Sequence, residues 1–210
     1  MSRKKTGEIR AVLFDLGKVL LHFNFDPAFK RLARSSPFGA KDIEDYFVTS
    51  GVEVPYDGGK VSSRFFYRQV KTALRLRLGF EGFRRVWNGI FTPNADMIAL
   101  VRRLRRHKKG YRLVLISNTN AMHYDHLRKR YAVLGLFDRH VLSFREKRRK
   151  PDEKIYRTAI RACRARPEEI FYIDDRADLT GAAAEIGLRT HTFKNDVPAL
   201  LAEMKELGIL

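Results

Sequence analysis

The sequence predicts an α/β protein, in which a parallel sheet is flanked by helices and an all-helical segment is inserted after the first strand. Three short apolar runs, at residues 9–14, 111–116 and 170–173, each lead directly into polar residues. Short apolar runs of this kind are typical of strands buried on both faces of a sheet. Helical patterns between them complete a strand–helix alternation, which indicates a Rossmann-like architecture with helices on both faces.

The remaining elements follow the same alternation. Weaker strand patterns lie at residues 140–144 and 188–193. A helix is predicted over residues 95–108, because Thr92-Pro93-Asn94 before it is a capping sequence and Gly110 follows it. Proline or glycine also ends the other predicted helices, which span residues 152–165, 177–186 and 196–207.

Residues 25–91 interrupt this alternation. The segment has no convincing strand pattern, is rich in aromatic residues and is divided by turn-forming proline and glycine residues. We therefore predict several short helices that form a small subdomain, with most of the aromatic side chains in its core. The predicted division is a catalytic core made of residues 1–24 and 92–210 and a helical subdomain made of residues 25–91.

The composition is that of an ordinary globular protein, with 44% hydrophobic and 31% charged residues in a chain of 210. It excludes collagen-like, low-complexity and wholly disordered chains. The single cysteine, Cys163, excludes an intramolecular disulfide and a cluster of cysteine metal ligands. The apolar run after the polar N-terminus is far shorter than the ~20 residues that span a bilayer, so we expect a cytoplasmic protein without membrane contact.

The net charge of +18 arises from 42 Lys and Arg against 24 Asp and Glu. Such a surface attracts polyanions, from phosphorylated metabolites to nucleic acid, but basic residues also simply fill solvated helix faces. Neighbouring basic residues, as in 102–109 and 128–130, spread around a helix rather than form one stripe. This pattern favours solvated faces over a nucleic-acid partner.

Polar residues follow three of the predicted strands. Asp15 follows the first, Ser117-Asn118 the second and Asp174-Asp175 the third. Ligands of open α/β sheets bind at the carboxyl ends of the strands, and neighbouring strands are only ~4.8 Å apart. Asp15 could therefore face the Asp174-Asp175 pair. Carboxylates this close repel each other, and Mg²⁺ removes the conflict.

Lys150, directly before a proline and a predicted helix, could add a fixed positive charge to this group. Carboxylates, a lysine and hydroxyl or amide donors suit phosphoryl transfer, in which a carboxylate can be the covalent nucleophile. Each residue also has an ordinary structural interpretation. An Asp after a strand is often a turn former, and Asn118-Thr119-Asn120 could cap a helix that begins at Ala121.

The motifs resemble those of the haloacid dehalogenase-like hydrolase superfamily over nearly the whole chain, and the helical insertion resembles its helical cap. The first motif, Asp-Leu-Gly, is similar to that of the glucose-1-phosphatase-like branch. The four matching segments are Phe-Asp-Leu-Gly-Lys-Val-Leu at 14–20, Leu-Ile-Ser-Asn-Thr-Asn at 115–120, Lys-Pro-Asp at 150–152 with Ile155-Tyr156, and Ile-Asp-Asp-Arg-Ala-Asp at 173–178 with Gly181-Ala182.

The resemblance implies a Mg²⁺-dependent phosphatase that acts on a small phosphorylated metabolite, a sugar phosphate being one candidate. Asp15 would be the nucleophile and form an aspartyl-phosphate, which Lys150 would steady. Ser117 and Asn118 would bind the phosphoryl group. The implied metal ligands are Asp15, the Gly17 carbonyl, Asp175 and Asp174, the last either directly or through a metal-bound water.

Three positions depart from the family pattern. Most phosphatases of the superfamily have a second Asp at the place of Gly17, as a general acid and base worth typically ~10²–10⁴-fold. Its absence implies either a slow enzyme or one whose leaving group needs little protonation, as in anomeric, acyl or aryl phosphates. Lys18 replaces a small residue and could bind the phosphate or point to solvent. The basic loop at residues 145–149 could line the active site and favour a polyanionic substrate, or be solvated.

Two other functions compete with the phosphatase. A metal-independent dehalogenase shares the fold and the nucleophilic Asp, but typically lacks the paired carboxylates found here as Asp174-Asp175. A catalytically weak relative could instead bind polyanions or nucleic acid through its basic clusters. The sequence predicts no oligomeric state.

Overall fold

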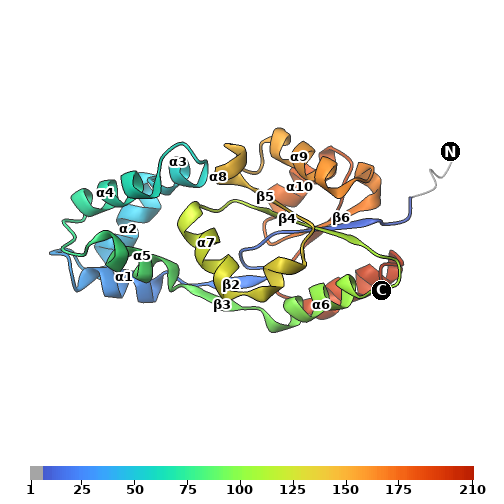
Figure 1. The fold of residues 1–210 in the computed structure, drawn as a ribbon, viewed down its shortest axis with the longest axis horizontal. Helices are drawn as coiled ribbons and strands as arrows, with labels where there is room; N and C mark the ends of the chain where they lie inside the picture. Colours follow the sequence, from blue (N-terminus) through green and yellow to red (C-terminus); the bar gives the residue numbers. More distant parts are fainter. Residues whose placement is uncertain (1–6) are drawn as a thin grey trace.

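The structure is a computed structural model that describes residues 7–210. Its main sheet has five parallel strands in the order β5-β4-β1-β6-β7. The strands coincide with the five predicted segments, so the α/β prediction is confirmed (Figure 1). Their bounds are β1 (Ala11–Phe14), β4 (Arg112–Ser117), β5 (Arg139–Leu142), β6 (Ile170–Asp174) and β7 (Arg189–Thr192). The strand predicted at residues 140–144 ends early, at Leu142, because α8 (Ser143–Glu146) begins there.

Both faces of the sheet are buried, which explains why its central strands are apolar at successive positions. On β1, Val12 and Phe14 belong to one apolar cluster, whereas Ala11 and Leu13 belong to the other. Helices α6 (Ala95–Arg105) and α11 (Val197–Glu206) complete the first cluster. Helices α9 (Glu153–Cys163) and α10 (Ala177–Glu185) complete the second on the opposite side of the sheet (Figure 1).

The helices begin where side chains satisfy their first backbone N–H groups. The Asn94 side chain accepts a hydrogen bond from the backbone of Met97, as the capping sequence predicts. Asn120 caps α7 (Ala121–Arg130) in the same way. Two short 3₁₀ helices, η1 (Ala132–Leu136) and η2 (Pro167–Glu169), complete the core. Within residues 7–210, no helix is long and apolar enough to cross a membrane.

Five helices lie between β2 (Leu21–Phe23) and β3 (Phe91–Pro93), at the left of Figure 1. They pack around Trp87, whose ring contacts Phe25, Phe47, Phe66 and Phe83 at centroid distances of 4.9–5.7 Å. The aromatic residues of this segment thus supply a separate apolar cluster. The helices are α1 (Asp26–Ala33), α2 (Ala40–Ser50), α3 (Glu53–Asp57), α4 (Ser63–Ala73) and α5 (Phe80–Asn88).

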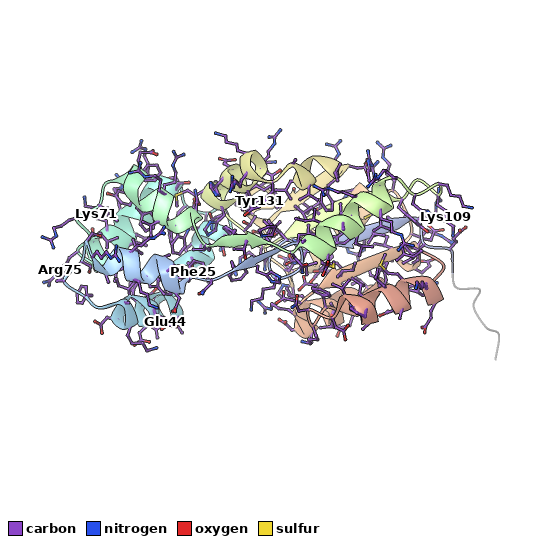
Figure 2. All side chains as sticks on the ribbon, turned by 90° about the horizontal axis from the view of Figure 1, so that it is seen from below. Phe25, Glu44, Lys71, Arg75, Lys109 and Tyr131 are labelled. Atoms are coloured by element: carbon purple, nitrogen blue, oxygen red, sulfur yellow. The ribbon has the colours of Figure 1, made fainter. Side chains whose placement is uncertain are left out.

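The two chain segments that connect the helical part to the sheet are hydrogen-bonded to each other. β2 and β3 form an antiparallel pair, which Asn24 extends with a 3.0 Å hydrogen bond to Ile90. This ribbon coincides with the predicted boundaries after residues 24 and 91. Figure 2 shows Phe25 at the end of the helical part nearest the sheet. The assignment of residues 25–91 as a separate domain stays a prediction.

A second contact joins the helical part to the core at Gly59, between α3 and α4. Its φ is +66°, and a Cβ built there would lie 2.0 Å from the carbonyl oxygen of Phe144 on α8. Only glycine lets the two backbones approach so closely. Nearby, the Ser143 hydroxyl donates to the carbonyl of Asp57 over 2.6 Å.

We therefore expect Gly59→Ala to displace the α3–α4 connection from α8. The matched control is Gly110→Ala, because Gly110 has a φ of +63° and no atom within 4 Å of a built Cβ. Both variants should lose about 1 kcal/mol through the left-handed backbone conformation. Gly59→Ala should lose measurably more in urea unfolding, because of the added clash. Equal losses of unfolding free energy in the two variants would show that the backbone at Phe144 moves away from the added methyl group without loss of stability.

Candidate active site

The candidate site lies at the carboxyl ends of the three central strands. β1 pairs with β4 on one side and with β6 on the other, so that Phe14 is in register with both Leu115 and Ile173. The strands β4 and β5 are thus added on one side of β1, and β6 and β7 on the other side. Ligands of α/β proteins bind at the point where the strand order reverses in this way. This register brings Asp15 beside Asp174, as the sequence predicts.

The buried ammonium group of Lys150 holds this site together. Its Nζ donates to Asp15 Oδ1 over 2.7 Å and to Asp174 Oδ2 over 2.5 Å. It also donates to the Tyr172 hydroxyl over 3.1 Å. Lys150 is 4% exposed, Asp15 7% and Asp174 not at all. A lysine so deeply buried is stable only because its charge is paired and its donors are used.

Asn118 fixes the backbone that carries Lys150. The backbone N–H of Lys150 donates to Asn118 Oδ1 over 2.8 Å, and Asn118 Nδ2 donates to the carbonyl of Lys150 over 2.9 Å. Both polar atoms of the Asn118 side chain are thus occupied by the lysine. The structure gives Asn118 a positioning role, and its predicted contact with a phosphoryl group stays a prediction.

Three carboxylates converge next to this lysine. Ligand atoms from Asp15, Asp174 and Asp175 all lie within 4.8 Å of one another. The pKa of Asp15 is raised to about 7. Burial and the charge of Asp174 raise it, and the charge of Lys150 opposes this rise. Burial and Asp174 also raise the pKa of Asp175. The buried ammonium of Lys150 and the exposed ammonium of Lys18, 4.0 Å from Asp175, leave one negative charge of the three carboxylates uncompensated.

A divalent cation would balance this excess. Carboxylate oxygens are the donors that Mg²⁺ prefers, and one ion bound by two or three of them would remove the repulsion that raises their pKa values. The donor set therefore fits Mg²⁺. Asp178 lies outside the group, because its side chain is exposed and pairs with Arg176. The predicted ligand role of the Gly17 carbonyl stays a prediction.

Tyr172 is a site residue that the sequence analysis missed. The Tyr172 hydroxyl donates a hydrogen bond to Asp174 Oδ2 and accepts one from Lys150 Nζ, so it bridges these two side chains. A signal was present in the sequence. Tyr172 stands two residues before Asp174 on β6, and residues two apart on a strand point to the same face.

Phe23 occupies the space beside Gly17, where most of the superfamily's phosphatases have an acid. A Cβ built on Gly17 would lie 3.0 Å from Cε1 of the Phe23 ring. An Asp at this position would therefore require the ring to move. The neighbouring Lys18 has a largely exposed side chain, with its Nζ 4.0 Å from Asp175 and 5.7 Å from the centre of the Phe23 ring. Its predicted contact with phosphate stays a prediction.

A cavity of about 270 Å³ opens beside these residues. Ser117 lines it, as expected for a substrate-binding residue at the end of β4, and so does His123 near the N-terminus of α7. Burial lowers the pKa of His123 to about 3, so its ring is neutral. The lining consists of Leu16, Gly17, Phe23, Phe25, Glu53, Asp57, Ile90, Phe91, Ser117, Asn118, Thr119, Asn120 and His123.

A family model described as haloacid dehalogenase-like hydrolase matches residues 9–187. The chain belongs to the haloacid dehalogenase-like hydrolase family. The match includes all four segments on which the sequence resemblance rests and every residue of the candidate site. Asp15, whose carboxylate Lys150 contacts directly, lies within this match, and its role as nucleophile stays a prediction.

Two curated relatives of this hydrolase are phosphatases by name. Sesquiterpene phosphatase astK of Aspergillus oryzae is 25% identical over 85% of this chain and 87% of its own. D-ribitol-5-phosphate phosphatase of Bacteroides thetaiotaomicron is 23% identical over 89% and 93%. A haloacid dehalogenase family enzyme from B. thetaiotaomicron, crystallised with magnesium and inorganic phosphate, has the same fold. Its TM-score is 0.79, at 24% identity over 89% of this chain and 94% of that one.

Tyr172→Phe tests the bridge between Lys150 and Asp174 in this hydrolase. Removing one buried hydroxyl should cost about 1 kcal/mol of stability and lower turnover, because Lys150 and Asp174 each lose one partner. The matched control is Tyr67→Phe, whose hydroxyl donates to the carbonyl of Leu78 in the helical part, away from the site. It should lose similar stability in urea unfolding and keep its turnover. Equal turnover in both variants would contradict a positioning role for Tyr172.

Proposed function

We propose that this protein is a Mg²⁺-dependent phosphatase that hydrolyses a small phosphorylated metabolite through an aspartyl-phosphate on Asp15. The observation that best supports this is the cluster of Asp15, Asp174 and Asp175 around the buried Lys150, next to a cavity lined by Ser117. The two curated phosphatases that resemble the chain along most of its length support the same reaction.

Each residue of the cluster has a defined task in this reaction. A carboxylate oxygen of Asp15 attacks phosphorus, the bond to the leaving oxygen breaks, and that oxygen takes up a proton. Water then cleaves the aspartyl-phosphate, which releases inorganic phosphate and restores the carboxylate. Mg²⁺ held by Asp15, Asp174 and Asp175, with the Gly17 carbonyl, would neutralise phosphate charge.

The other side chains hold the reacting groups in place. Lys150 fixes one oxygen of Asp15, so that the other can point to phosphorus, and its charge favours the dianionic phosphate. The Ser117 hydroxyl would donate to a phosphate oxygen, and Lys18 would reach the phosphate from its exposed side. The helices of residues 25–91 would act as a cap that closes the cavity over the leaving group.

The absence of an acid at Gly17 sets the class of leaving group. The Phe23 ring fills the space beside Gly17, so an apolar ring lies where the acid of other phosphatases would be. We propose that the substrate leaves as a group of low basicity, as from an anomeric, acyl or aryl phosphate.

The first expectation concerns the nucleophile and the metal. Hydrolysis of p-nitrophenyl phosphate should require Mg²⁺, and Asp15→Asn should lower kcat by at least about a thousandfold. The matched control, Asp178→Asn, removes an exposed carboxylate near the site and should keep its activity. Mg²⁺ should also raise the melting temperature of the wild type, and Asp175→Asn should reduce that shift.

Two results would favour the competing functions. Turnover of a 2-haloacid without metal would support a dehalogenase, against which the paired Asp174 and Asp175 argue. Salt-sensitive binding to DNA or RNA without any phosphatase activity would support a polyanion-binding relative.

The second expectation concerns the leaving group. We expect glucose 1-phosphate to be hydrolysed at least about tenfold faster than glucose 6-phosphate, because an anomeric oxygen leaves with less need for a proton. The measurement is kcat on both substrates at saturating Mg²⁺. Equal values would show that another group supplies the proton that an Asp at Gly17 would give.

A further inference from the structure

The cavity beside the nucleophile has two chemically different ends. Ser117 and Gly17 line the end that belongs to the core, where the phosphoryl group is expected. Glu53 and Asp57, both from the short helix α3, line it from the helical part of the chain. None of the described residues that line this cavity is Lys or Arg. In a protein with a net charge of +18, the wall that faces the leaving group is therefore acidic.

The two acids differ in what they already contact. Asp57 accepts a hydrogen bond from Asn120 Nδ2 over 3.1 Å and lies 3.9 Å from the guanidinium of Arg149. Among the described residues, nothing donates a hydrogen bond to the Glu53 carboxyl group or forms an ion pair with it. Asp57 thus joins the helical part to the core, whereas Glu53 keeps its hydrogen-bonding capacity for a ligand.

Of the arginines in the basic loop at residues 145–149, Arg149 alone partly offsets these acids. The Arg145 guanidinium lies over the rings of Tyr124 and Phe144, at 4.8 and 5.5 Å from their centres. Arg148 contacts Asp152 on its own side of the loop. Only Arg149 turns towards α3, and there it meets Asp57. The hypothesis that this loop selects a polyanionic substrate therefore has no support in the geometry.

Aromatic rings line the same cavity as the acids. Phe23 packs against Phe25 and Phe91 at centroid distances of 5.9 and 6.2 Å, and His123 lies 4.9 Å from Phe91. These rings carry no charge, because His123 is buried and neutral. Uncharged aromatic side chains bind the apolar face of a substrate ring or alkyl chain, and a carboxylate in the same cavity accepts hydrogen bonds from substrate hydroxyl groups.

We propose that Glu53 is a specificity residue that accepts a hydrogen bond from a hydroxyl of the leaving group and rejects substrates with a second anionic group there. The substrate class is then the monophosphate of a neutral hydroxylated compound. The proposal rests on the phosphatase function and narrows it. A carboxylate in this cavity repels another carboxylate or phosphate at close range, so selection arises from charge as well as shape.

Two substrates that differ in one group test the proposal. α-D-Glucose 1-phosphate carries a hydroxymethyl group where α-D-glucuronic acid 1-phosphate carries a carboxylate, and both have the same anomeric leaving oxygen. We expect the wild type to prefer the first in kcat/KM by at least about tenfold. Glu53→Gln should reduce this preference at least about fivefold, mainly through a lower KM for the glucuronic acid compound. Glu53→Lys should reduce it further.

The matched control is Glu81→Gln, which removes an exposed carboxylate of α5 that pairs with Arg84. It should keep the wild-type preference. A preference that is equal in the wild type and Glu53→Gln would overturn the role of Glu53 while leaving the phosphatase intact. No hydrolysis of either sugar phosphate or of p-nitrophenyl phosphate would instead overturn the proposed function itself.

The pH dependence of the preference provides a readout that a purely structural role would not move. Burial, together with the charge of Asp57, raises the pKa of Glu53 to about 7, and Arg149 opposes this. Asp26 and Glu44 share a neighbouring cavity with Glu53, and each is paired with a lysine, Asp26 with Lys30 and Glu44 with Lys41. Glu53 is therefore mostly neutral at pH 6 and charged at pH 8, so the wild-type preference should increase between them.

Titration of the phosphate and of the nucleophile affects both substrates alike and cancels in the ratio. Glu53→Gln should remove most of the pH dependence of the ratio, and the remainder would come from Asp57, whose pKa burial also raises. A wild-type ratio as flat as that of Glu53→Gln would contradict the proposal. A fall in kcat for both sugar phosphates but not for p-nitrophenyl phosphate would make Glu53 a proton donor to the leaving oxygen. That result would also overturn its role in recognition.

Discussion

The ion cluster of Lys150 with Asp15 and Asp174 is the interaction on which the site depends. All three groups are almost fully buried, and their side chains come from three separate parts of the chain. Breaking a buried ion pair by removing one partner typically costs about 3–5 kcal/mol, because the other charge is left without compensation. The cluster therefore constrains the ends of β1 and β6 and the segment before α9 to one arrangement.

The fold supplies this constraint at little cost to its own stability. The sheet satisfies the backbone of every central strand, and both of its faces are covered by apolar side chains. The polar groups of the site lie at and near the carboxyl ends of the central strands, where Asn118 binds the backbone of Lys150 and Tyr172 accepts from its ammonium group. The same geometry places three carboxylates next to one buried ammonium group. The excess of negative charge makes a divalent cation a suitable partner.

The helical part gives the site its second chemical character. Its own core is built around Trp87, and it contacts the rest of the protein at Gly59, at Asp57, along the β2–β3 ribbon and at α7, where Tyr56 accepts from the Met122 backbone and Asn88 contacts His123. It therefore presents aromatic rings and two acids to the cavity without altering the reacting groups. Division of labour of this kind lets one hydrolase core act on different leaving groups.

The sequence by itself determined the α/β class, the five strands and the placement of Asp15, Ser117 and Asp174 at strand ends. These features depend on local patterns of apolar residues and on the fact that parallel strands end at one edge of a sheet. The family resemblance added the order of the motifs, and the family model agrees with it.

Only the tertiary structure decided which side chains share the site. Asn118 binds the backbone of Lys150, which lies 32 residues further along the chain. Asp57 accepts a hydrogen bond from Asn120 across 63 residues, and Glu53, on the same helix as Asp57, lines the same cavity as Ser117. Contacts between residues so far apart in sequence depend on how the helical part packs on the core, which no local pattern encodes. The orientation of the basic loop followed from the same packing, because Tyr124, Asp152 and Asp57 were available to its arginines.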